Sequence, residues 1–175
     1  MGVILRRRQA DLERLRELAA ANPGRIEIVA VEGEPPSMIR VRLTCQSVVE
    51  LPAAGQPVLG NRHLLRVQFG QRYPLEPPLV YVESPIANPH VFPTTRRICI
   101  GVAWTPSETL DLFVQRVWAI LAWDPQVIDP NSPANLSALK WSEDHRHRLP
   151  IEPARLRSAD APVVAAARPR LSWRG

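Results

Sequence analysis

Alternating and helical stretches of the sequence together indicate an α+β domain, with an N-terminal helix, a four-stranded antiparallel meander, a long loop and two further helices. Two observations support this fold. Apolar residues recur at helical spacing near the start of the chain and again after residue 105, whereas four short alternating stretches lie between. The alternating stretches are joined by short polar turns, which suit antiparallel neighbours and are too short for parallel crossovers.

The first element is an amphipathic helix over residues 3–21. Leu5, Leu12, Leu15 and Ala19 recur at helical spacing, with arginines and acidic residues between them. The sequence Asn-Pro-Gly at 22–24 ends the helix, because proline and glycine both disfavour its continuation.

The four strands are predicted around residues 26–28, 39–45, 65–69 and 79–82. In the second strand, Ile39, Val41, Leu43 and Cys45 alternate with polar residues. Because successive side chains of a strand point to opposite faces, this register places Cys45 on the core side. We therefore expect Cys45 to be a structural thiol.

No periodicity survives from residue 84 to residue 102, although the stretch is rich in apolar side chains and is therefore expected to be ordered. The sequence Thr-Pro-Ser-Glu at 105–108 reads as a capping box with proline at the first helical position. It predicts a buried helix that runs to about Trp123. Ser132 and Pro133 predict the start of a shorter helix that reaches Trp141.

Composition limits the possible functions. The net charge of +5 comes mainly from arginines at the two ends of the chain, so no basic stripe suggests nucleic-acid binding. No apolar run reaches the ~18 residues of a membrane helix. Two isolated cysteines favour a reducing, cytoplasmic setting over a disulfide framework. We expect no metal and no cofactor, because no histidine has ligand spacing with Cys99 and no phosphate loop is present.

After Leu149 the chain becomes rich in proline, alanine and arginine and loses all periodicity. Such a stretch buries little apolar surface. We expect one domain over residues 1–149, followed by a mobile tail over residues 150–175.

Five short motifs follow one another along the second half of the chain. They are Tyr73-Pro74-Leu75-Glu76-Pro77-Pro78, Asn88-Pro89-His90, Ile98-Cys99-Ile100-Gly101, Trp104-Thr105-Pro106 and Asp124-Pro125-Gln126-Val127-Ile128-Asp129-Pro130. Their order and spacing resemble the active-site segment of ubiquitin-conjugating enzymes. The resemblance implies the ubiquitin-conjugating (UBC-like) fold, with residues 1–149 as its catalytic domain.

The resemblance makes Cys99 the candidate nucleophile. A family member accepts a ubiquitin-like protein as a thioester from an activating enzyme and transfers it to an amine of a protein target. For Cys99, flanked by two isoleucines, the alternative is a buried structural thiol. The arginine-rich composition and the Asn-Pro-His variant resemble bacterial relatives, which implies a JAB-type peptidase in the same system and a role in antiphage defence.

Two other residues follow from the same resemblance. His90 occupies the position of the family's asparagine, whose carboxamide orders the loop or stabilises the oxyanion, and an imidazole can serve either purpose. Asp129 matches an acid that orients or deprotonates the attacking lysine, although Asp-Pro pairs are also common at turns. On the first helix, Arg6, Arg7 and Arg14 are expected to dock the activating enzyme, as this helix does in the family.

A second function is compatible with the same motifs. The chain could be a catalytically inactive UBC-fold binding module that docks a ubiquitin-like partner. Inactive variants generally lose the cysteine, whereas this chain keeps Cys99 in register. A nucleic-acid binder would have only the basic ends in its favour.

Overall fold

The computed structural model describes residues 2–52, 56–100, 104–152 and 155–157. Its elements, in chain order, are α1 (Val3–Ala21), β1 (Ile26–Glu32), β2 (Met38–Glu50), β3 (Val58–Gln68), β4 (Leu79–Val82), α2 (Leu110–Leu121), α3 (Leu136–Asp144) and a 3-10 turn (Arg146–Arg148). The α+β order predicted from the sequence is thereby confirmed.

The sheet is an antiparallel meander in the order β1-β2-β3-β4. β2 and β3 are much longer than predicted, because the alternation of β2 is interrupted rather than ended after Cys45. A register shift lies between Thr44 and Ser47, and beyond it Ser47 and Val48 are both fully buried. A bulge of this kind lets a strand continue with its side chains on changed faces, so simple alternation stops short of the strand's end.

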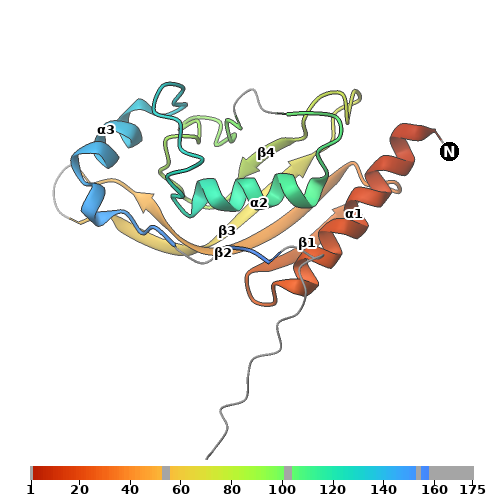
Figure 1. Ribbon diagram of the computed structural model, residues 1–175, viewed down its shortest axis with the longest axis horizontal. Helices are drawn as coiled ribbons and strands as arrows, with labels where there is room; N and C mark the ends of the chain where they lie inside the picture. The colour runs from red at the N-terminus through yellow and green to blue at the C-terminus, as the bar shows by residue number, and fades with distance from the viewer. Residues whose placement is uncertain (1, 53–55, 101–103, 153–154, 158–175) are drawn as a thin grey trace, which may run out of the picture.

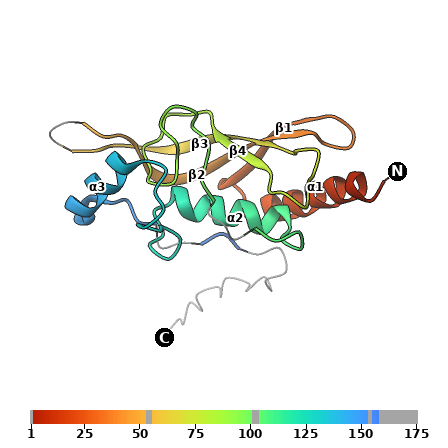
Figure 2. The ribbon, with the colours of Figure 1, turned by 90° about the horizontal axis from the view of Figure 1, so that it is seen from above.

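Figure 2 shows the sheet nearly edge-on, with α1, α2 and α3 on the same side of it. In Figure 1, α2 crosses the middle of the sheet, with α1 and α3 toward opposite ends. The core between helices and sheet contains Leu15 of α1, Val41 of β2 and Phe113 of α2, each with no exposed surface. Cys45 lies in this core, as predicted, and burial raises the pKa of its thiol to about 12.

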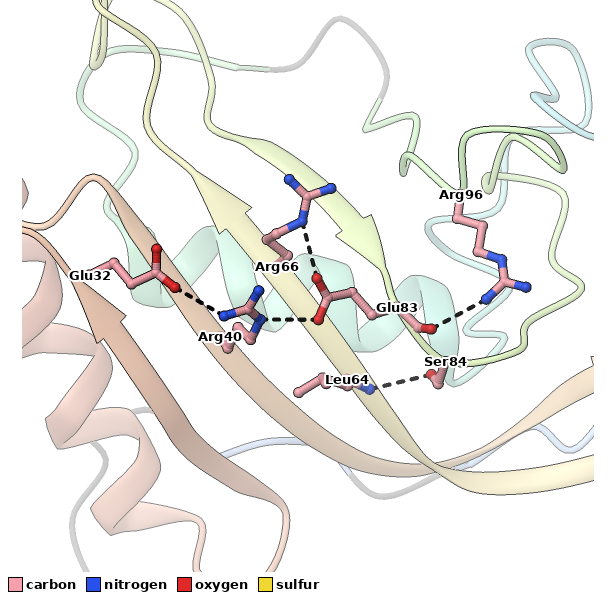
Figure 3. Close-up of polar contacts among 7 residues, drawn as sticks. All are labelled: Glu32, Arg40, Leu64, Arg66, Glu83, Ser84 and Arg96. Carbon is pink, nitrogen blue, oxygen red and sulfur yellow. Dashed lines mark hydrogen bonds and ion pairs between the residues drawn. The ribbon is translucent and has the colours of Figure 1, made fainter.

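The solvent-facing side of the sheet carries a network of charged side chains (Figure 3). Arg40 and Arg66 are direct cross-strand neighbours, which would repel each other if left alone. Glu83 lies between them and accepts from the Nε atoms of both, at 3.2 and 3.1 Å. Glu32 binds Arg40 from the other side, at 3.0 Å. Exposed ion pairs contribute little each, so this network mainly keeps like charges apart on a solvated face.

A buried carboxylate joins α1 to the rest of the fold. Asp11, only 1% exposed, accepts hydrogen bonds from the Tyr73 hydroxyl, from Arg7 Nε at 2.7 Å and from the Leu110 backbone N–H at 3.2 Å. Burial, together with Asp11, raises the pKa of Tyr73, so its hydroxyl stays protonated and donates. Tyr73, the first residue of the Tyr-Pro motif, thereby connects this loop to α1.

The predicted role of Arg7 in docking a partner conflicts with its position. Its guanidinium also donates to the backbone carbonyls of Pro106, at 2.9 Å, and Glu108, at 2.6 Å. Arg7 therefore ties α1 to the segment that precedes α2. Arg6 and Arg14, by contrast, are exposed on α1.

The start of α2 also differs from the prediction. Residues 105–108 form a turn, in which the Glu108 N–H donates to the Thr105 carbonyl at 2.9 Å, and the helix begins only at Leu110. The N–H of Leu110, the first residue of α2, donates instead to the side chain of Asp11, which belongs to α1. The Glu108 side chain pairs with Arg116 instead of reaching back to cap the helix. A tertiary partner has replaced the local cap expected from the sequence.

The start of α3 lies later than predicted as well. The helix begins at Leu136, three residues beyond Pro133, and its N-cap is Asn135. The Asn135 side chain accepts from the Ala138 N–H at 3.0 Å, which satisfies one of the unpaired donors of the first turn.

Residues 150–152 and 155–157 lie beyond the predicted domain boundary and pack on the domain. We call these residues the C-terminal strap. Leu156 is 9% exposed in the core, and Glu152 pairs with Arg25 at 3.1 Å. Asn22, at the end of α1, donates to the Arg157 carbonyl at 2.8 Å and accepts from the Arg157 N–H at 2.7 Å. The packed part of the chain thus extends past Leu149, and the rest of the predicted tail lies outside the described residues.

Within the described residues, no helix combines the length and the apolar character needed to cross a membrane.

Candidate active site

Cys99 lies at the end of the long irregular segment, directly after an isolated bridge between Val91 and Ile98. Its backbone N–H donates to the His90 carbonyl at 2.7 Å, which fixes the two residues against each other. Unlike the buried Cys45, Cys99 is partly exposed. It opens into a cavity of about 200 Å³. The lining residues are His90, Cys99, Ile100, Arg116, Ile120, Val127, Asp129 and Ser132.

The Asn-Pro-His segment is clamped on both sides. The buried Asn88 side chain donates to the Ile120 carbonyl at the end of α2, at 2.9 Å, and accepts from the His90 N–H at 2.9 Å. On the other side, the Pro89 carbonyl accepts from the Ala134 N–H at 2.8 Å. Sequence reasoning assigned no role to Asn88, although an amide placed two residues before His90 is suited to such a turn. It is the residue that places His90 over α2.

The His90 ring makes the contact that joins this segment to the loop after α2. Its Nε2 accepts a hydrogen bond from the Asp129 backbone N–H at 2.9 Å. An accepting nitrogen carries no proton, so the ring is neutral with its proton on Nδ1. Burial lowers the pKa of His90, against the opposing effects of the Asp129 charge and the Cys99 backbone. The imidazole is therefore uncharged at neutral pH.

Asp129 belongs to an exposed turn. Its carboxylate accepts from the Asn131 N–H at 2.8 Å, and the residue lines the same cavity as Cys99. Three residues proposed from the sequence are thereby brought together, namely Cys99, His90 and Asp129. Figure 1 shows the teal loop after α2 returning beside the green segment that carries Cys99. Arg6 and Arg14, by contrast, lie on α1 and do not line the cavity.

The Trp-Thr-Pro motif anchors the segment that follows. The Trp104 indole donates to the Pro74 carbonyl at 2.9 Å, and its ring lies 5.9 Å from Tyr73 and 5.5 Å from Phe113. Two motifs that are about 30 residues apart in the sequence are therefore one packing unit. That unit fixes the segment before α2.

The chemistry available at this site is that of a thiol. A thiolate is both a strong nucleophile and a good leaving group, so it can accept and release an acyl group. Asp129 offers a carboxylate near the cavity mouth, and His90 offers one N–H. In the part of the chain that the structure describes, no three His, Cys, Asp or Glu side chains are grouped so as to hold a metal ion.

The meander, the crossing α2 and a partly exposed cysteine beside the Asn-Pro-His segment together define the ubiquitin-conjugating class of α+β domains. The family model described as "Ubiquitin-conjugating enzyme" matches residues 29–149. The chain belongs to this family.

Individual relatives agree with this assignment. Over 98 residues the chain is 26% identical to ubiquitin-conjugating enzyme E2 16 of Schizosaccharomyces pombe, a match that covers 54% of this chain and 58% of that protein. It is 29% identical to ubiquitin-conjugating enzyme E2 2 of Yarrowia lipolytica, over 61% of this chain and 68% of that one. The matches therefore span about three fifths to two thirds of these proteins.

Solved structures show the same fold. A structure from Plasmodium yoelii aligns with a TM-score of 0.60 and 21% identity, over 84% of this chain and 88% of its own. The E2 domain of a Toxoplasma gondii ubiquitin conjugating enzyme aligns with a TM-score of 0.54 and 22% identity, over 79% and 89%.

Proposed function

We propose that the chain carries a ubiquitin-like protein as a thioester on Cys99 and transfers it to an amine of a protein target. The observation that supports this is the contrast between the two thiols. Cys99 is partly exposed in a cavity shared with His90 and Asp129, whereas Cys45 is in the core with a pKa raised by burial. A reactive cysteine needs access, and only one of the two has it.

Two acyl transfers make up the reaction. In loading, the Cys99 sulfur attacks the thioester carbonyl held by an activating enzyme, a new S–C bond forms, and the enzyme's thiol leaves with a proton. In discharge, a neutral amine attacks the acyl carbon on Cys99, an amide forms and the Cys99 thiol is released. The second step requires a neutral amine. A nearby carboxylate such as that of Asp129 can accept the proton that the amine loses.

An inactive binding module is the second candidate function. It would need the docking surface but not an accessible thiol. The exposure of Cys99 and its position beside His90 favour the enzyme over the module.

The deciding experiment is a loading assay with a cognate activating enzyme, ATP and modifier. The wild-type chain should shift on a gel by one modifier, and a thiol reductant should remove the shift. Cys99→Ser should lose the reductant-sensitive shift, and Cys45→Ser should keep it. Lys140 is the only lysine of the chain, so it is the only lysine side chain that the chain could modify on itself. A gel shift that the Lys140→Arg variant retains is therefore not due to modification of this lysine. A wild-type chain that never loads, or a shift that persists in Cys99→Ala, contradicts the proposal.

Partners and setting belong to the same proposal. An activating enzyme would dock on α1 through the exposed Arg6 and Arg14. A bacterial origin, a cytoplasmic location, a JAB-type peptidase and a role in antiphage defence follow from the resemblance of the Asn-Pro-His variant to bacterial relatives. Neighbouring genes for an adenylating enzyme and such a peptidase would support this setting, and their absence would count against it.

A further inference from the structure

The C-terminal strap reaches the loop that carries Asp129. Arg155 of the strap donates through Nη2 to the Gln126 side-chain oxygen at 2.6 Å, and the same nitrogen lies 3.4 Å from Oδ2 of Asp124. Asp124 and Gln126 stand at the start of the loop after α2, and Asp129 follows three residues later. The strap lies beyond residues 29–149, the part of the chain that matches the family model, so the match does not account for this contact.

Arg155 is itself placed by its neighbours in the strap. Leu156, the next residue, is only 9% exposed in the core. The Arg157 backbone then exchanges two hydrogen bonds with the Asn22 side chain, at 2.7 and 2.8 Å. The Arg155 side chain is 68% exposed, so its ion pair with Asp124 adds little stability. Because its backbone is fixed, however, the side chain still determines where its partners in the loop lie.

The loop after α2 depends on contacts of this kind. The chain leaves α2 through Trp123, whose φ of 57° places a non-glycine residue in the left-handed region. A residue in this conformation persists only where the surrounding structure holds it. Pro125, Gln126 and Asp129 are exposed, so apolar burial does little to fix these residues. Hydrogen bonds to other parts of the chain are therefore needed to keep the loop in one place.

The loop is held from outside at both of its ends. At its start the strap binds a turn that is closed by hydrogen bonds from the Gln126 N–H to Asp124 Oδ1, at 2.9 Å, and from the Val127 N–H to the Asp124 carbonyl, at 3.1 Å. At its other end the Asp129 N–H donates to His90 at 2.9 Å. Val127 and Asp129 both line the active-site cavity, so the two attachments position the wall that presents the carboxylate.

Resting on the function proposed above, we infer that Arg155 is a positioning residue for discharge. It holds the start of the loop against the strap, and the Asp129 carboxylate is thereby kept at the active-site cavity, where it accepts the proton of the attacking amine. Arg155 does not itself line that cavity, so it acts through the loop and touches neither the thioester nor the amine. Loading requires no neutral amine, so the effect is confined to discharge.

The test uses the intact chain, with the acetyl-diglycine thioester of a small thiol in place of a modifier and its activating enzyme. The Cys99 sulfur attacks the acyl carbon, an S–C bond forms, the bond to the small thiol breaks, and that thiol leaves with the proton. Free lysine is then added, an amide forms, and the Cys99 thiol is released with a proton from the amine. Intact mass follows both steps, and the loss of adduct without lysine is subtracted.

Arg155→Ala should load at the wild-type rate and discharge to lysine about fivefold more slowly, which corresponds to about 1 kcal/mol, the upper end for an exposed pair. Gln126→Ala, which removes the acceptor, should behave in the same way. Discharge to hydroxylamine, a nucleophile that is already neutral at neutral pH, should stay at the wild-type rate. Arg157→Ala is the matched control, because it removes an exposed strap arginine but keeps the backbone hydrogen bonds, and it should discharge like wild type.

A double variant separates positioning from a merely structural role, with melting temperatures recorded to show that each protein folds. Adding Arg155→Ala to Asp129→Ala should cause no further loss, because Arg155 acts only through that carboxylate. An equal loss in both backgrounds, or an equal loss toward hydroxylamine and lysine, would overturn the inference. Wild-type discharge by Arg155→Ala would also overturn it and leave the proposed function standing. A wild-type chain that forms no adduct on Cys99 counts against both.

Discussion

His90 and Asp129, 39 residues apart in the chain, are joined by a 2.9 Å hydrogen bond in which the imidazole Nε2 accepts from the Asp129 backbone N–H. This bond connects the segment that leads to Cys99 with the loop that presents the Asp129 carboxylate. It also leaves Nδ1 as the nitrogen that carries the proton. Among the described residues no group accepts from Nδ1 in hydrogen-bonding geometry, although the Cys99 backbone lies close enough to raise the pKa of the ring. We therefore propose that Nε2 orders the loop and that Nδ1 is the nitrogen available to stabilise the oxyanion, two roles that substitution can separate.

Substituting His90 separates these two roles. His90→Ala should slow discharge by on the order of 10²–10³, the usual effect of losing one oxyanion donor. It should also lower stability by about 1–2 kcal/mol, because the Asp129 N–H loses its acceptor. His90→Asn should retain much of the discharge rate. The measurements are single-turnover discharge to free lysine and the melting temperature. A folded His90→Ala protein that discharges at the wild-type rate would exclude the oxyanion role.

Acid should weaken the His90–Asp129 bond. Burial holds the pKa of folded His90 below its ordinary value of 6.5, so the unfolded chain binds the proton more readily. The stability from this site is therefore fully present above about pH 6.5 and falls as the pH drops from there toward the folded pKa. His63, also buried with a lowered pKa, acts in the same direction.

The melting temperatures of wild type, His90→Asn and His63→Gln between pH 5 and pH 8 separate the two histidines. Each variant should show a shallower fall on acidification than wild type. An unchanged slope in His90→Asn would mean that the ring does not titrate differently on folding.

Asp129→Ala should spare loading and slow discharge. Only discharge requires a neutral amine, and the carboxylate can accept its proton or orient it. A loss of about 10²-fold in discharge, within the usual range for a general base, is the expected size. Asp129→Asn is the control for the turn, because its amide oxygen can still accept from the Asn131 N–H. If loading and discharge fall together in both variants, Asp129 acts by holding the loop.

The arginines of α1 should divide into two groups. Arg7→Ala leaves the buried Asp11 carboxylate without its guanidinium partner and should cost about 3 kcal/mol of stability. Arg6→Glu and Arg14→Glu change exposed positions and should leave the melting temperature nearly unchanged while slowing loading at low salt. If the Arg6→Glu/Arg14→Glu double variant loads at the wild-type rate at low salt, these two residues do not take part in docking.

Truncation should show where the domain ends. Removal of everything after Leu149 deletes the core contact of Leu156, the Glu152–Arg25 pair and both hydrogen bonds between Asn22 and Arg157. We expect a loss of about 2–4 kcal/mol, from apolar burial and lost hydrogen bonds. Truncation after Arg157 should have little effect. Equal melting temperatures for the two proteins would restore the boundary at Leu149.

Features set by neighbouring residues could be predicted from the sequence, whereas features set by distant residues could not. The alternation of β2 predicted the burial of Cys45. The resemblance to ubiquitin-conjugating enzymes, rather than any local pattern, placed Cys99, His90 and Asp129 in one candidate site, and these three residues line one cavity. The capping box at 105–108 failed because Asp11, about a hundred residues earlier, accepts the first helical N–H. Arg7 was taken for a surface residue because nothing in an arginine-rich helix marks the one that meets a buried carboxylate.

The strap was missed for a related reason. Its anchoring residues, Leu156 and Arg157, stand in a stretch without periodicity, and a single apolar side chain gives no pattern to detect. In the described part of the chain, the hydrogen bonds of Arg157 are made by its backbone, so the identity of its side chain carries no signal.

The paired hydrogen bonds between Asn22 and Arg157 also concern the order of events during synthesis. The two residues are separated by 135 positions, so the end of α1 stays open at this point until almost the whole domain has left the ribosome. Contacts so distant in sequence are late to form, because a long loop must close before they stabilise anything. The nascent chain can therefore assemble its meander and the Cys99 segment first. The two hydrogen bonds that join the end of α1 to the C-terminal strap form only after Arg157 has been synthesised.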